Sequence, residues 1–333
     1  MAVTSENGVT GGKLGRTAGY YLAFVAFGLA VAALGPALPW LAEQTRSDLG
    51  QISILFTANA LGFLLGAPLG GRLYDYLPGH LLMIASLVSM ALAIFLVPFM
   101  PMLWLLVLLY LVIGTALGVL EVGCNTLLVW THSQNLGPWL NGLHLFFGIG
   151  AVISPPIMAW VIATSGDIDL GFWILAGAIL IPALWLVWVP SPAIRGSGDG
   201  QGVVPLDMRL LLLITLIFLL YVGAEVSFGG WIYTYTILTL PGSEAMAGSL
   251  TSAFWAALTL GRMLAIPLST RLTPRVILGL DFVGCIVSGA LIIIWPGSVP
   301  VIWIATLGMG LSMASIFPTL LTFSERRMAI TGT

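Results

Sequence analysis

Two acidic residues lie deep inside long apolar stretches of this sequence, where an ionisable group is costly. Glu121 occurs in LEVGCNTLLVW and Glu225 in YVGAEVSFGGW. If these stretches cross a membrane, each charge near the bilayer centre costs about 2.5–3.5 kcal/mol on insertion scales, so such a residue is a functional hypothesis by default. A carboxyl group at that depth can carry a proton for part of a cycle. We therefore interpret Glu121 and Glu225 as proton- or ion-coupling groups.

A third acid, Asp281, lies nearer the end of its apolar stretch. From that position its side chain can reach toward the membrane surface, or pair with Arg275 or Arg262. We interpret Asp281 as a structural residue.

Polar side chains recur at helical spacing around these acids. Asn125 follows Glu121 by one turn, on a face that also carries Gly114 and Gly118; small residues beside an acid favour a face turned toward other helices or a cavity. Aromatic rings can stack on the apolar face of a sugar, although some of these rings and stripes can equally form an interfacial belt or tight helix contacts. The candidate solute-binding residues are Asn125, Asn141, His144, Asn59, Tyr221, Trp231 and Trp255.

The composition restricts the class of protein that holds these residues. Of 333 residues, 59% are hydrophobic and 7% are charged, with a mean hydropathy of +1.07. A soluble domain carries about 25% charged residues, so a soluble enzyme, a nucleic-acid binder and a disordered protein are excluded. A net charge of -2 indicates no charged macromolecular partner. The sequence is that of a polytopic membrane protein.

No motif for catalysis or cofactor binding is present. The sequence lacks a phosphate-binding GxxxxGK[ST] loop, an HExxH or GxSxG motif, and any His/Cys cluster with metal-ligand spacing. Cys124 and Cys285 lie in apolar runs and are interpreted as packing residues. We expect no cofactor, no bound metal and no enzymatic activity.

The continuous apolar runs predict an all-α fold, because each is long enough for a membrane-spanning helix of about 20 residues. We also expect a local break or a close helix contact at Gly229 and Gly230. The ten predicted spans are 18–41, 50–72, 79–99, 102–130, 138–164, 170–189, 208–238, 246–268, 275–295 and 299–323.

The basic residues predict the orientation. With the N-terminus in the cytoplasm, ten of the 11 Lys and Arg residues fall at cytoplasmic ends and only Arg46 falls outside, as the positive-inside rule requires. The ten are Lys13, Arg16, Arg72, Arg195, Arg209, Arg262, Arg271, Arg275, Arg326 and Arg327.

The longest connection divides the chain into two halves. We expect a cytoplasmic tail over 1–17, a six-helix half over 18–190, a cytoplasmic linker over 191–207 and a four-helix half over 208–333. Six helices, a linker and four helices suggest a 6 + 6 transporter of which the last two helices are missing. A true ten-helix protein is the alternative.

Four segments resemble parts of a known superfamily. The loop GRLYDYLPGH, from Gly71 to His80, resembles the signature of the major facilitator superfamily: Gly71 and Asp75 match, and His80 stands where that motif has a base. LEVGCN and YVGAEVSFGGW resemble the fourth and seventh helices of the fucose–proton symporter family. NGLHLFFGIGAVISP, from Asn141 to Pro155, resembles the fifth helix of the sodium-dependent glucose transporter-like group.

The resemblance implies sugar uptake by alternating access, coupled to protons or sodium. It carries Glu121 over as proton carrier and Asn125 as a substrate or helper group, while Gly71, Asp75 and Arg262 would act in gating. The first helix holds no acid where the symporter has one, so Glu225 is the candidate partner of Glu121.

The leading hypothesis is a multi-pass cell-membrane transporter of a small polar solute, which we expect to be a sugar, working as a monomer. A drug–proton antiporter of the same superfamily is an alternative, although GIGAVISPP has Ser154 before Pro155 where antiporters show Gly-Pro. A non-transporting receptor stays open, and a membrane-embedded enzyme lacks paired catalytic groups.

Overall fold

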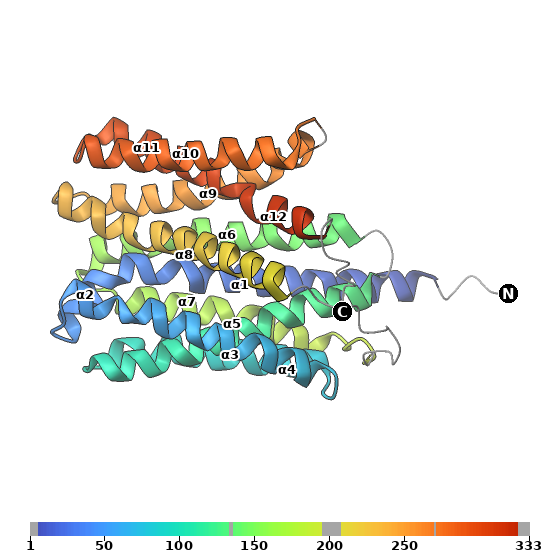
Figure 1. Ribbon diagram of the computed structural model, residues 1–333. Coiled ribbons are helices and arrows are strands. Elements are labelled where there is room, and N and C mark those ends of the chain that lie inside the picture. The colour runs from blue at the N-terminus through green and yellow to red at the C-terminus, as the bar shows by residue number, and fades with distance from the viewer. Residues whose placement is uncertain (1–5, 133–135, 195–207, 270, 326–333) are drawn as a thin grey trace. The chain divides into compact units, whose positions relative to one another are not determined.

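The computed structural model of the protein describes residues 6–132, 136–194, 208–269 and 271–325, and over these residues it is helical without strands. Ten helical segments are long and apolar enough to cross a membrane, so the predicted all-α multi-pass fold is confirmed. The helices of Figure 1 are α1 Glu6–Gln44, α2 Leu49–Ile52, α3 Ile54–Tyr74, α4 Gly79–Leu96, the 3-10 turn η1 Val97–Phe99, α5 Leu103–Thr131, α6 Leu136–Ser165, α7 Asp169–Trp188, α8 Met208–Thr239, α9 Glu244–Ser269, α10 Pro274–Ile294, α11 Val299–Ala314 and α12 Ile316–Glu325.

The chain forms two compact units, Met1–Gly196 and Ser197–Thr333, which we call the N half and the C half. Most of the predicted linker, with Arg195, lies outside the described residues, as do Arg326 and Arg327. In the N half, α1 packs along α6, α3 along α5, and α4 against α5 and α7. In the C half, α9 and α10 each pack along α11, and α8 packs on α9.

Glycines bring the paired helices of the N half into backbone contact. A Cβ added to Gly114 would lie 2.0 Å from the carbonyl oxygen of Asn59, and one added to Gly66 would lie 2.1 Å from that of Thr115. The stripe with Gly114 and Gly118 is therefore the α3–α5 interface and not the wall of a cavity. Close approach through small residues is how membrane helices gain packing energy without a hydrophobic driving force.

Three boundaries differ from the predicted spans. The helix α1 begins at Glu6, so much of the predicted tail is helical. The predicted second span is interrupted at Ser53, between α2, which Asp48 caps, and α3. The predicted tenth span breaks at Ser315, because Pro318 has no N–H to donate to the carbonyl of Ala314 and its ring crowds that carbonyl.

Helix α8, in contrast, runs unbroken through Gly229 and Gly230. Of the two predicted alternatives there, the close contact is the one found. A Cβ on Gly229 would lie 2.8 Å from the ring of Trp255 on α9, so only glycine fits beside that indole without a shift.

Candidate functional site

Glu121 lies past the middle of α5 with its side chain half-buried. Within the described residues its carboxylate makes no hydrogen bond and no ion pair. The amide of Asn125 donates to the main-chain carbonyl of Glu121 at 2.9 Å, as a mid-helix side chain does when it bonds one turn back. The amide nitrogen expected to assist the carboxylate is thus occupied by the backbone.

The remaining solute-binding candidates of the N half lie on two helices, α3 and α6. Asn59 of α3 has its main chain against Gly114, and its side-chain oxygen is buried without a partner among the described residues. His144 of α6 meets the ring of Phe24 edge to face, with centroids 5.8 Å apart. Asn141, one turn earlier on α6, is exposed. The structure therefore does not bring these three candidates into one cluster with Glu121.

Glu225 of α8 is the centre of a compact polar cluster in the C half. Its carboxylate contacts the hydroxyl of Tyr221, one turn earlier, and lies 3.4 Å from the guanidinium of Arg262 on α9. The Tyr221 hydroxyl also lies 3.0 Å from the carbonyl of Met313 on α11. Helices α8 and α9 thus meet at this carboxylate, and α11 joins the cluster through the Tyr221 hydroxyl; the Glu225 side chain is 11% exposed.

Arg262 lies two turns before the end of α9, and its side chain is 24% exposed. A largely buried guanidinium needs a counter-charge, which Glu225 supplies. On the same helix, Trp255 is buried against Phe254 and Gly229. Trp231 of α8 is half-buried.

Asp281 of α10 does not form the pairs predicted for it. Its carboxylate accepts a hydrogen bond from the hydroxyl of Ser315 at 2.7 Å, at the break between α11 and α12. Arg262 is paired with Glu225 instead. The sequence does show Ser315 as a polar residue in an apolar segment, three residues before Pro318. It does not show that Asp281 is the partner of Ser315.

The loop that resembles the superfamily signature joins α3 to α4. Asp75 is the C-cap of α3, and among the described residues its carboxylate has no hydrogen bond or ion pair. An added Cβ on Gly71 would meet no atom within 4 Å. His80 is not a loop base: it is 4% exposed, and its ring nitrogens lie 2.9 Å from the hydroxyl of Tyr20 and 2.9 Å from the carbonyl of Val189.

A second histidine, which sequence reasoning missed, also contacts the N-terminal part of α1. The ring of His132 lies 2.6 Å from the hydroxyl of Thr17 and stacks on Trp139, with ring centroids 4.0 Å apart. Burial and the nearby Lys13 charge lower the pKa of His132, so the neutral ring is favoured. These contacts explain why α1 stays helical beyond its apolar stretch.

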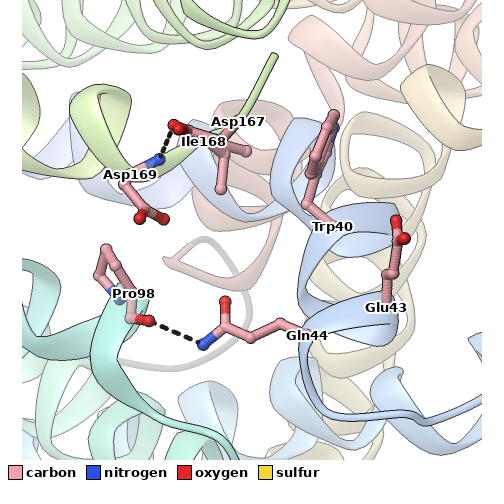
Figure 2. A pocket seen from close by; sticks show the side chains of 7 residues that line it. All are labelled: Trp40, Glu43, Gln44, Pro98, Asp167, Ile168 and Asp169. Carbon is pink, nitrogen blue, oxygen red and sulfur yellow. Dashed lines mark hydrogen bonds between the residues drawn. The ribbon is translucent and has the colours of Figure 1, made fainter. Parts of the chain in front are cut away.

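A cavity of about 300 Å³ opens at the opposite end of the N half (Figure 2). In it, Gln44 donates to the carbonyl of Pro98 at 3.2 Å, and Asp169 donates from its main chain to Asp167 at 3.0 Å. No candidate residue from the sequence lines it. Its walls are Trp40, Glu43, Gln44, Pro98, Asp167, Ile168 and Asp169.

Comparison with known proteins places this arrangement in a family. The chain is 30% identical to sodium-dependent glucose transporter 1A of Mus musculus over 94% of this chain and 82% of the relative. It is 29% identical to sodium-dependent glucose transporter 1 of Xenopus laevis, over 91% of this chain and 68% of the relative. The predicted resemblance to the sodium-dependent glucose transporter-like group is confirmed.

Solved structures share the fold. The nucleoside transporter NupG superposes with a TM-score of 0.74 at 15% identity, over 96% of this chain and 83% of that one. A bacterial homologue of the human lysosomal transporter Spinster gives 0.70 at 14% identity, over 96% and 76%. The sequence profile of the Major Facilitator Superfamily matches residues 20–333, and the chain belongs to this superfamily of membrane transporters.

Proposed function

We propose that this protein is a secondary active transporter of a small polar solute, a sugar, that works by alternating access and is coupled to protons or sodium. The names of the relatives support the substrate class, since those proteins are called sodium-dependent glucose transporters. The solved structures support the fold alone, so their substrates carry no weight for this chain.

One observation carries the coupling proposal: the Glu121 carboxylate stands inside α5 with no partner among the described residues. A fixed charge at that depth is costly, and neutralisation removes most of the cost. A proton or a cation that arrives with the solute would provide that neutralisation. Glu225, already paired with Arg262, is the proposed second coupling group.

The remaining roles follow from position. Rocking of two halves around a central site would expose that site to each side in turn. Asn59, Asn125, Asn141, His144, Tyr221, Trp231 and Trp255 are proposed to contact the solute, and Gly71, Asp75 and Arg262 to act in gating. We also propose that the protein works as a monomer in the cell membrane, with a cytoplasmic N-terminus that its basic residues support.

The test is uptake into liposomes that contain the purified full chain. Labelled hexose should accumulate above its outside concentration when an inward sodium or proton gradient is imposed, and the matching ionophore should abolish the accumulation. Equal hexose concentrations on both sides under every gradient would contradict coupled transport. A cationic dye expelled in exchange for protons, without hexose uptake, would establish the antiporter alternative.

A further inference from the structure

The hydroxyl of Tyr221 meets two hydrogen-bond acceptors at once. It contacts a carboxylate oxygen of Glu225 and lies 3.0 Å from the carbonyl oxygen of Met313. A phenol has one hydrogen to donate, whereas a carbonyl and an ionised carboxylate can only accept. Both contacts are hydrogen bonds together only when Glu225 is protonated, because Glu225 then donates to Tyr221 and Tyr221 donates to Met313.

The Met313 carbonyl has a particular place in the fold. It belongs to the last turn of α11, and its oxygen also accepts the backbone N–H of Ser315, the residue at the break. The helix resumes as α12 at Ile316. The Tyr221 hydroxyl of α8 is therefore a second donor to this oxygen, which has two lone pairs, while Asp281 of α10 holds Ser315 from another side.

We propose that Tyr221 transmits the protonation state of Glu225 to the break between α11 and α12. When Glu225 is ionised, Tyr221 donates to it beside Arg262, and the Met313 carbonyl loses its side-chain donor. When Glu225 takes up a proton from water, the chain Glu225–Tyr221–Met313 closes and the end of α11 is fastened. The inference rests on the proposed coupling role of Glu225 and adds the element on which that role acts.

Arg262 of α9 is the charged group in contact with Glu225, since its guanidinium lies 3.4 Å from one carboxylate oxygen and 3.5 Å from the other. From α10, Asp281 reaches the break through Ser315. The described side chains of α12 include no titratable group. In the proposed switch, the proton that Glu225 takes up comes from bulk water.

Infrared spectroscopy on the full chain in lipid tests the proposal. Methionine labelled with ¹³C at the carbonyl reports its hydrogen bonds, and M313L identifies the Met313 band. E225Q identifies the carboxyl band of Glu225. On acidification the Met313 band should shift with the same midpoint as the Glu225 band. In Y221F the Met313 shift should be lost while Glu225 still titrates.

The matched control is Y235F, which removes another hydroxyl from α8 that lies 3.4 Å from a main-chain carbonyl, that of Ile292, without a carboxylate. It should leave the Met313 shift intact. A Met313 band that stays constant while Glu225 titrates, or that still shifts in Y221F, overturns the inference and leaves the transport proposal standing. A Glu225 band that does not titrate overturns both the inference and the coupling role of Glu225, whereas the uptake assay judges transport itself.

Discussion

The two membrane-embedded glutamates have contrasting surroundings. Glu121 of α5 has no partner for its carboxylate among the described residues, whereas Glu225 of α8 contacts Tyr221 and Arg262. A carboxylate without a partner must be compensated by something that comes and goes, while a paired one is compensated by the protein itself. If both acids act in coupling, as proposed, we expect substitution of Glu121 to affect mainly transport, and substitution of Glu225 to affect both transport and the stability of the C half.

The largest effect on transport is expected from E121Q, which mimics the protonated acid. Uphill accumulation should fall at least about tenfold, or ~1.4 kcal/mol of coupling, and its pH dependence should flatten. Solute exchange without a gradient should persist. The melting temperature should not fall, since the substitution removes a carboxylate that has no partner among the described residues. The measurement compares gradient-driven uptake with counterflow in liposomes, with E43Q near the C-terminal end of α1 as the matched control.

If E121Q still concentrated solute with normal pH dependence, Glu121 would be structural and the contrast between the two acids would disappear. A large loss of thermal stability in E121Q would have the same consequence, since it would reveal an interaction of the carboxyl group that the fold requires.

The largest effect on stability is expected from R262M, which leaves the carboxylate of Glu225 without its counter-charge. Breaking a buried pair costs about 3–5 kcal/mol, and the lower end applies because 24% of the Arg262 side chain is exposed. The double variant E225Q/R262M should recover most of that loss. Thermal unfolding in detergent measures the stability of E225Q, R262M and the double variant. If the loss in the double variant equals the sum of the two single losses, the pair does not interact.

A smaller effect on stability is expected at the Asp281–Ser315 bond. S315A removes a donor to a carboxylate and should cost about 1.5–3 kcal/mol. D281N keeps an acceptor for the Ser315 hydroxyl and should cost less. The same thermal assay applies to both. A larger loss in D281N than in S315A would indicate a partner of Asp281 other than Ser315.

The smallest change in stability is expected at Asp75, which lies at the membrane edge and not within a helix. D75N should shift stability by no more than about 0.5 kcal/mol, as for most surface substitutions. If Asp75 gates transport, the maximal rate should fall several-fold at nearly constant solute affinity. Initial uptake rates at varied solute concentration give the maximal rate and the solute affinity separately. A loss of affinity at an unchanged maximal rate would exclude gating.

The sequence was sufficient to predict the helices, because apolar runs of membrane-spanning length have one stable conformation in lipid. The all-α fold and the ten spans were predicted from this signal alone. The break at Ser315 was not predicted, although Pro318 is a signal for it, because a hydropathy pattern carries no information about a missing backbone N–H. The start of α1 was missed because residues 6–17 are not apolar; two of them, Arg16 and Thr17, contact Pro190 and His132, which are distant in the sequence.

Within the candidate site, residue spacing predicted which side chains are neighbours on one helix, but it could not predict which side chains of different helices are in contact. Tyr221 and Glu225 were placed on one face, and they are in contact. The Arg262–Glu225 pair joins two helices, and nothing in a single sequence specifies which helices meet. Asn125 illustrates the opposite failure, since a residue one turn away can satisfy the backbone and not the neighbouring side chain.

The glycine contacts of the N half have a consequence for how sequence variants of this transporter should be interpreted. Gly28 and Gly150 each stand against the backbone of the opposite helix, where an added Cβ would lie 2.1 Å from a carbonyl oxygen. A variant library screened for new solutes should therefore be almost empty at these positions, even though they contact no solute. Variants there that abolish uptake would report failed assembly of α1 with α6, and should be counted as losses of protein rather than losses of recognition.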